Sequence, residues 1–129
     1  MPAYDETWFD PPAPLARVIL RNPHNAVTVS DVPMLLDSGA DVTLIPMTVA
    51  VQIGLSVDAE ESYELIAFDG SISTASVVQL EMSFLHKTFR GRFLLIDQEW
   101  GVLGRDILNL LTLLLDGPNL SWSEQRRGR

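Results

Sequence analysis

The 129-residue sequence contains no cysteine and few basic residues. Without cysteine, the chain can form no disulfide, no thiolate nucleophile and no cysteine-ligated zinc or iron–sulfur site. Nine basic residues against seventeen acidic residues give a formal charge of −8, so the average field repels the phosphates of nucleic acids and of anionic lipids. We therefore expect neither nucleic acid nor a membrane as a partner.

The sequence also lacks a long apolar run. The longest such stretch, residues 107–115, is interrupted by Asn109 and Thr112 and has about half the length of a bilayer-spanning helix. Residues 1–14 carry acidic side chains and prolines, with no basic region followed by an apolar run, which is unlike a signal peptide. We therefore expect a cytoplasmic protein.

Patterns of metal ligands are scarce as well. His24 and His86 lie in predicted turns, and neither has a partner at ligand spacing. Asp37 and Asp41 are not followed by a third carboxylate at the spacing of a cation-binding loop. We predict no metal site and no cofactor.

Length and composition favour one globular domain. The chain is 47% hydrophobic and 20% charged, as in ordinary globular proteins, and its length suits a single core. Prolines predict an extended arm over residues 1–15, and arginines predict a basic, solvated tail over residues 124–129. The predicted domain therefore covers residues 16–123.

The remaining pattern predicts many short strands and one or two short helices. We expect strands at residues 16–21, 26–29, 32–36, 63–68, 73–84, 88–96, 102–103, 112–115 and 120–122. Short helices are expected over residues 46–53 and 105–111, an acidic loop over residues 58–61, and a tight turn at Asp69-Gly70. Without a long amphipathic helix, this pattern predicts a mostly β, barrel-like fold.

The candidate chemistry lies at Asp37-Ser38-Gly39. An apolar strand here delivers a carboxylate, a hydroxyl and a glycine in succession into a turn that Gly39 can relax. Taken alone, the triplet favours a plain turn, in which the aspartate and the serine bond to their own backbone. A functional interpretation therefore needs a second observation.

A second segment supplies that observation. Residues 102–108 again have two apolar residues, a glycine and the start of a helix. Together with residues 35–41 and the Asp69-Gly70 hairpin between them, this segment resembles the retropepsin family, the single-domain aspartic proteases of retroviruses and their bacterial relatives. The resemblance extends from about residue 16 to residue 122 and implies a closed β-barrel of the acid-protease type.

The resemblance implies a role for each matched residue. Asp37 matches the catalytic aspartate, Ser38 the hydroxyl residue that locks two active-site loops together across a dimer, and Gly39 the glycine that lies against the substrate. Ala40 completes the support of that loop. Arg105 matches an arginine that pairs with the second aspartate of the first motif, here Asp41. The flap that closes over bound peptide matches Phe68, Asp69, Gly70, Ser71 and Ile72.

The Arg105–Asp41 pair also has a physical basis. A cation at the start of a helix opposes the macrodipole, so its placement suggests a compensating anion. If the pair is deeply buried, loss of Arg105 should cost roughly 3–5 kcal/mol. The alternative is an exposed arginine beside Asp106 as the residue that caps the helix.

The chemistry of peptide hydrolysis agrees with these roles. One group must take a proton from water while another donates a proton to the carbonyl oxygen, and two adjacent carboxylates that share a proton can do both. The sequence has only one aspartate with the hydroxyl-glycine order, so the second must come from another copy of the chain. We predict a homodimeric aspartic endopeptidase that cleaves peptide or protein substrates in extended, apolar-rich segments.

Two other classes stay open at this point. The fold could serve as a catalytically idle module for dimerisation or peptide binding, or the chain could be a β-barrel binding domain in which Asp-Ser-Gly is only a turn. Intact Asp37, Ser38 and Gly39 favour the enzyme over the idle module. The plain-turn interpretation leaves the placement of Gly104-Arg105-Asp106 unexplained. The leucine-rich run at residues 108–115 is expected in the core or the dimer interface.

Overall fold

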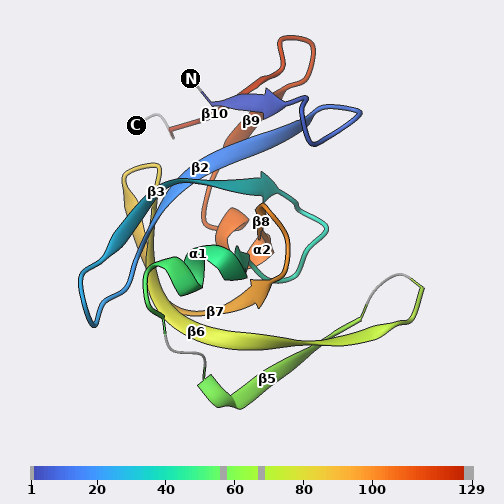
Figure 1. Cartoon of the computed structure of the whole chain (residues 1–129). Coiled ribbons are helices and arrows are strands. Elements are labelled where there is room, and N and C mark those ends of the chain that lie inside the picture. The colour runs from blue at the N-terminus through green and yellow to red at the C-terminus, as the bar shows by residue number, and fades with distance from the viewer. Residues whose placement is uncertain (1, 56–57, 67–68, 127–129) are drawn as a thin grey trace.

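The computed structural model describes residues 2–55, 58–66 and 69–126. In chain order its elements are β1 (Ala3–Asp5), β2 (Ala13–Arg21), β3 (Thr28–Leu36), β4 (Leu44–Pro46), α1 (Met47–Gln52), β5 (Asp58–Ile66), β6 (Ile72–Phe84), β7 (Lys87–Ile96), β8 (Gly101–Leu103), α2 (Arg105–Leu108), β9 (Leu113–Asp116) and β10 (Ser121–Glu124) (Figure 1). All of these strands belong to one sheet. The prediction of a mostly β fold with one or two short helices is confirmed.

The sheet closes into a barrel. Its strands follow the order β6-β7-β4-β8-β3-β2, and antiparallel pairing of β2 with β6 then completes the ring. Strand β2 shows why the wall forms, because its side chains alternate between inside and outside. Ala16, Val18 and Leu20 are fully buried, whereas Arg17 and Ile19 face solvent.

The interior of the ring is filled by aliphatic side chains from every wall strand. The largest fully buried side chains include Leu20, Met34, Ile45, Leu80, Met82 and Leu103. Helix α1 begins after Pro46 and covers one end of the barrel with Ala50, which is 2% exposed. This single core fixes the relative positions of loops that are far apart in sequence.

Two segments that we expected to lie between strands belong to strands instead. Residues 26–29 and 32–36 were expected as separate strands, but β3 runs without interruption from Thr28 to Leu36. Asp31 adopts a positive φ of 57° beside a register shift against β2, so a bulge accommodates the extra residue. Residues 58–61 were expected as a loop, yet β5 begins at Asp58, because pairing with β6 overrides weak local strand propensity.

The N-terminal segment, which we expected to be an extended arm, contributes to the sheet at both of its ends. Strand β1 lies between β2 and β10, and β2 already begins at Ala13. Between these strands, Trp8 stacks on Trp100 at a centroid distance of 5.5 Å and Phe9 meets the same ring edge-on at 4.9 Å. Trp100 belongs to the loop before β8, so this aromatic cluster joins the N-terminal segment to the barrel.

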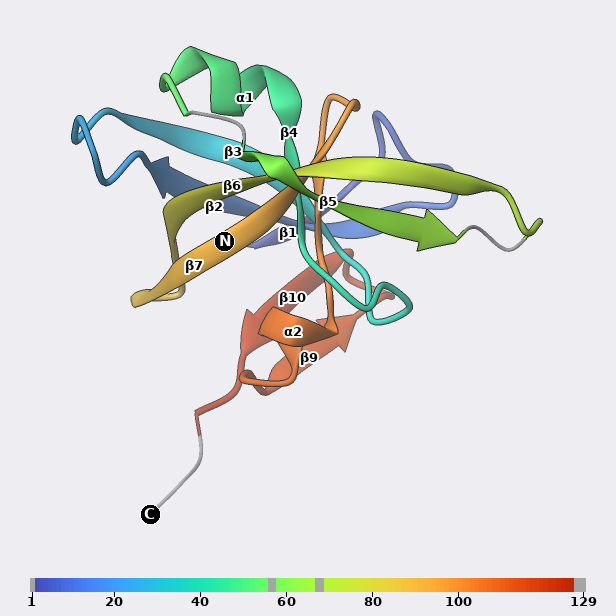
Figure 2. The same ribbon diagram turned by 90° about the horizontal axis from the view of Figure 1, so that it is seen from below.

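At the other end of the chain, β9 and β10 form a hairpin below the barrel in Figure 2. Because β1 pairs with both β2 and β10, the N- and C-terminal strands are adjacent within one chain. Strand β9 is the last strand of the sheet, and one of its edges has no partner among the described residues. The leucines 110, 114 and 115 near this edge are more than half exposed.

The β5–β6 hairpin extends from the opposite edge of the barrel. In Figures 1 and 2 its tip reaches past the barrel wall on the same side as the loop that follows β3. Ile66 pairs directly with Ile72 at the last described rung of this hairpin. The hairpin is therefore placed to lie over the end of the barrel where β3 finishes.

Among the described residues, no helix is long and apolar enough to cross a membrane. In the same part of the chain, no group of three or more potential metal-ligating side chains comes together.

Candidate active site

Two parallel strands finish side by side at the candidate site. Strand β3 pairs with β8 from Met34 opposite Gly101 to Leu36 opposite Leu103. Because the strands are parallel, Asp37 after β3 and Gly104 after β8 emerge at the same edge of the sheet. The backbone N–H of Asp37 donates to the carbonyl of Leu103 at 3.1 Å, which extends the ladder by one step.

The loop after β3 is a tight turn built on the Asp37 carboxylate. The Gly39 N–H donates to Asp37 Oδ1 at 2.9 Å, and the Ala40 N–H donates to the Asp37 carbonyl at 3.1 Å. A Cβ on Gly39 would lie only 3.1 Å from Asp37 Oδ1, so the glycine leaves room for the carboxylate. Asp37 is half-buried while Ser38 and Gly39 are exposed, so the turn presents its carboxylate at an open edge.

Gly104 holds the second loop against the first. A Cβ at this position would lie 2.4 Å from the carbonyl oxygen of Val42 and 2.9 Å from its nitrogen. Any larger residue would therefore force two backbone segments apart. The Arg105 N–H in addition donates to the carbonyl of Ala40 at 2.9 Å, which joins the two loops directly.

Thr43 is a structural residue of this site that sequence reasoning missed. Its hydroxyl donates to Asp106 Oδ1 at 2.7 Å and accepts the Gly104 N–H at 3.1 Å, while its own N–H donates to Asp106 Oδ2 at 3.1 Å. Thr43 is 1% exposed. No local pattern marked it, because Thr43 precedes the short strand β4 and its partner Asp106 is sixty-three positions away.

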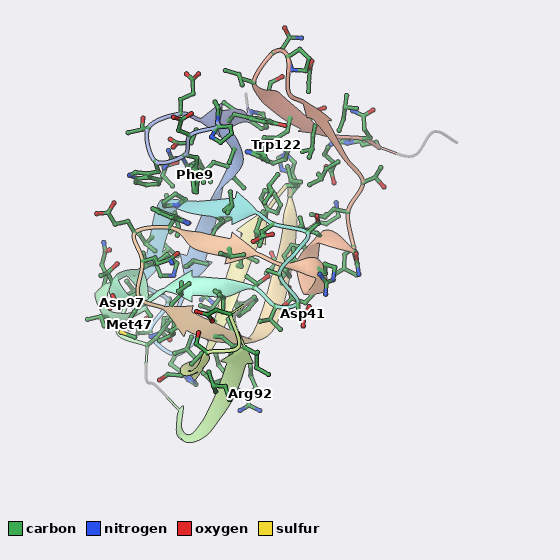
Figure 3. The ribbon with its side chains drawn as sticks, turned by 90° about the vertical axis from the view of Figure 1, so that its right-hand side faces the viewer. Phe9, Asp41, Met47, Arg92, Asp97 and Trp122 are labelled. Carbon is green, nitrogen blue, oxygen red and sulfur yellow. The ribbon has the colours of Figure 1, made fainter. Side chains whose placement is uncertain are left out.

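Arg105 and Asp41 form an ion pair, and a second guanidinium nitrogen of Arg105 donates to the carbonyl of Ser38 at 2.8 Å. Figure 3 shows Asp41 next to α2, the helix that Arg105 begins. The condition of deep burial is not met in a single chain, since the Arg105 and Asp41 side chains are 43% and 82% exposed. Both side chains are open to solvent, so water screens the pair.

The flap residues that are described lie at the hairpin tip. The Ser71 N–H donates to Asp69 Oδ1 at 2.9 Å, and Gly70 adopts a positive φ of 84°. Hydrogen bonds from the Ser71 side chain and backbone lower the pKa of Asp69 below its ordinary value. Ile66 and Ile72 are 74% and 62% exposed, and Phe68 lies outside the described residues. The tip therefore carries apolar side chains without a covering partner within the described part of the chain.

Asp37 lines neither the cavity at Trp122 nor the cavity at Glu81, two cavities of the described surface. The carboxylate thus lies on an open edge of one chain rather than in a closed pocket.

A closed six-stranded barrel with an Asp-Ser-Gly turn and a Gly-Arg-Asp turn at one end defines the acid-protease class of folds. The sequence model of a family described as aspartyl protease matches residues 26–107, which include both turns. The chain belongs to this aspartyl protease family, and the retropepsin-like resemblance is confirmed.

Solved structures agree on the fold. A retropepsin-like aspartic protease from Rickettsia conorii is similar with a TM-score of 0.61 and 15% identity, over 94% of this chain and 86% of that chain. EIAV protease complexed with the inhibitor HBY-793 is similar with a TM-score of 0.56 and 20% identity, over 75% of this chain and 86% of that chain. No curated protein sequence matches the chain. The closed barrel of the acid-protease type is therefore confirmed.

Proposed function

We propose that the protein is a homodimeric aspartic endopeptidase in which Asp37 from each of two chains forms the catalytic dyad. The observation that carries this proposal is a half-built site: one oriented carboxylate on a loop joined to a second loop at an open edge. Family membership and the retropepsin-like fold support peptide hydrolysis as the reaction. The residue roles are our assignment.

The chemistry needs the two carboxylates to share one proton. The ionised Asp37 takes a proton from water while the oxygen of that water attacks the peptide carbonyl carbon. The protonated Asp37 of the other chain donates its proton to the carbonyl oxygen. The tetrahedral species then collapses, the carbon–nitrogen bond breaks, and the leaving amine takes a proton from the dyad. Two like charges a few ångströms apart do not both ionise, so the partner carboxylate creates the acid.

A two-fold axis beside Asp37 is the simplest arrangement that brings this residue to its own copy. The exposed Ser38 would then meet the partner loop, and Ile66 and Ile72 of each flap would cover an extended substrate with apolar side chains. The free edge of β9, with Leu114 and Leu115 beside it, is our candidate for part of the interface. Buried apolar contacts of this kind stabilise obligate dimers.

Subunit mixing tests the proposal. Wild-type protein is titrated with excess Asp37→Asn chains, and cleavage of a peptide library is followed after subunit exchange. We expect Asp37→Asn alone to lose activity by orders of magnitude and mixed dimers to be inactive, so activity falls as the variant is added. The specific rate should also rise with concentration until dimers dominate.

Asp97→Asn is the matched control, because Asp97 is an exposed aspartate in the loop after β7, on another part of the surface from Asp41 in Figure 3. Excess Asp97→Asn chains should leave activity unchanged. A monomer by sedimentation with a cleavage rate that is flat on dilution contradicts the dimeric dyad. A stable dimer that cleaves nothing favours the idle binding module instead.

A further inference from the structure

The outer face of β2 contributes to two cavities that the proposed active site does not use. The outward side chains of this strand are Leu15, Arg17, Ile19 and Arg21. Leu15 and Arg17 line the first cavity, and Arg21 lines the second. The exposed Ile19 lies between Arg17 and Arg21 on this face and lines neither cavity, so the strand places two separate cavities along one face.

The first cavity has an apolar floor. It has a volume of about 360 Å³ and lies where β1 and β10 meet the β6–β7 turn. Leu15, Phe84 and Trp122 line it and are at most 5% exposed, and the two aromatic rings pack at a centroid distance of 5.9 Å. Figure 3 shows Trp122 where the C-terminal hairpin meets the barrel. A cavity of this size and lining suits a large apolar side chain.

One cation stands at the mouth of this cavity. Arg17 is exposed, and among the described residues no carboxylate lies within ion-pair distance of its guanidinium. The Asp5 carboxylate also lines the cavity, and its Oδ2 accepts the Trp8 N–H at 2.7 Å, so the cavity has one basic and one acidic side chain. A charged group beside an apolar cavity is placed to bind the carboxylate of a ligand.

The second cavity carries more positive than negative charge. It has a volume of about 390 Å³, and Glu81 at its centre forms ion pairs with both Arg21 and Arg90. Hydrogen bonds from Arg90 and then Arg21 lower the pKa of Glu81, so this carboxylate stays charged and the cluster has one excess positive charge. The hydroxyls of Ser83 and Thr88 also line it. Such a surface is unusual on a chain with a net charge of −8.

Register places the second cavity beside Ile19. Ile19 lies opposite Ser83, and Ser83 lies opposite Thr88, and these last two residues line the second cavity. Arg17 and Arg21 are four residues apart on one strand, which corresponds to about 13 Å. An extended peptide covers that distance in about four residues.

We propose that this face of β2 binds an acidic segment of another protein, with an apolar side chain in the cavity at Trp122 and carboxylates on Arg17 and on the Arg21–Arg90 cluster. Charge complementarity selects this occupant, because the two cavities together hold three arginines, Arg17, Arg21 and Arg90, against two carboxylates, on a chain whose net charge is −8. The apolar side chain in the cavity sets the direction in which the bound segment runs along β2. The site adds a docking function that does not involve Asp37.

Peptide binding to the Asp37→Asn chain tests the proposal without interference from cleavage. The probe is a fluorescein-labelled peptide with one tryptophan, three alanines and two glutamates, followed by fluorescence polarisation. We expect saturable binding that weakens with added salt and about tenfold when the tryptophan is replaced by alanine. Replacing both glutamates by lysine should abolish binding.

Variants of the protein locate the site. Arg17→Gln and Arg90→Gln should each weaken binding about tenfold, since each removes a charge-assisted hydrogen bond to the peptide. Arg126→Gln is the matched control, because it removes the same charge from an exposed position outside both cavities. We expect it to bind as the parent does.

Three results overturn the proposal: no binding of the acidic peptide, equal binding of the lysine peptide, or an Arg126→Gln effect as large as that of Arg17→Gln. Because the experiment uses chains without the Asp37 carboxylate, a failed docking site leaves the proposed protease activity untouched. Failure of the protease proposal likewise leaves this binding result intact.

Discussion

The active-site loop and the flap turn are both short turns that begin with an aspartate, but they are held in different ways. In each turn the carboxylate accepts the N–H two residues later, from Gly39 in one and from Ser71 in the other. The active-site loop has in addition long-range contacts to residues 103–106 through backbone and side chain. The described flap turn has only its own hairpin.

This difference agrees with different roles for the two turns. A catalytic carboxylate must be held close to one geometry. The two loops that meet where Gly104 contacts Val42, here called the crossed loops, provide this support. A flap must admit and release substrate, which suits a turn with few distant contacts. Substitutions in the two regions should therefore have very different effects on stability.

Gly104→Ala should have the largest effect. The new Cβ would lie within 3 Å of three backbone atoms of Val42, so the two loops must separate. We expect the free energy of unfolding to fall by about 3 kcal/mol, at the upper end of overpacking costs. Urea denaturation measures this loss. Gly117→Ala is the control, because a Cβ there meets no atom within 4 Å; equal losses would contradict the crossed-loop interpretation.

Thr43→Val should have the next largest effect. Valine keeps the shape but removes the hydroxyl that joins Asp106 to the buried Gly104 N–H. Leaving that donor without an acceptor should cost about 2 kcal/mol. Thermal and urea unfolding check this value, with Thr28→Val, at an exposed strand position, as control. An unchanged stability would show that water replaces the hydroxyl at no cost.

Arg105→Ala should have a smaller effect on a single chain. The ion pair with Asp41 is largely exposed, so we expect a loss of roughly 0–1 kcal/mol rather than the larger value expected from burial. A double-mutant cycle with Asp41→Ala, at a concentration where the protein is monomeric, measures the coupling. A coupling near 3 kcal/mol would show that the pair is shielded from water after all.

Asp69→Asn should have the smallest effect. Asparagine can also accept the Ser71 N–H, so the melting temperature at neutral pH should stay within error of the parent. Because the folded pKa of Asp69 is lowered, its small contribution is present above the unfolded pKa and is lost as pH falls through the folded value. The Ser71 amide resonance should shift over that acidic range in the parent and not in the variant. A transition at or above the ordinary aspartate pKa contradicts the hydrogen bond.

The sequence predicted the parts of the fold that local patterns determine. The helix after Pro46 follows from a proline at a helix start. The hairpin around Asp69-Gly70 was also predicted, but its connection is longer than the expected tight turn, because β5 ends at Ile66 and β6 begins at Ile72. Strand β4 was missed, because Leu44–Pro46 is too short for any periodic signal. It exists because β7 and β8 pair with it on its two sides. The identity of three residues does not predict such long-range pairing.

The candidate site shows the same limit. Residues 37–41 and Arg105 stood out as motifs, and the structure brings them together at one edge. Thr43 did not stand out, because no motif or periodic pattern includes Val42-Thr43-Leu44. Its role depends on Asp106, sixty-three positions away, and on a buried N–H that only the crossed loops create.

Strand β6 gives the flap a mechanical character of its own. It pairs with β5 from Ile72 to Val77 and with β7 from Val77 to Phe84, so Val77 is the residue of β6 at which both pairings meet. The strand is unbroken there, and Val77 is 1% exposed. The hairpin is therefore a cantilever whose support is the barrel wall. Because one unbroken strand runs from the flap into the ring that carries Asp37, a force on the tip would reach that ring through the backbone itself.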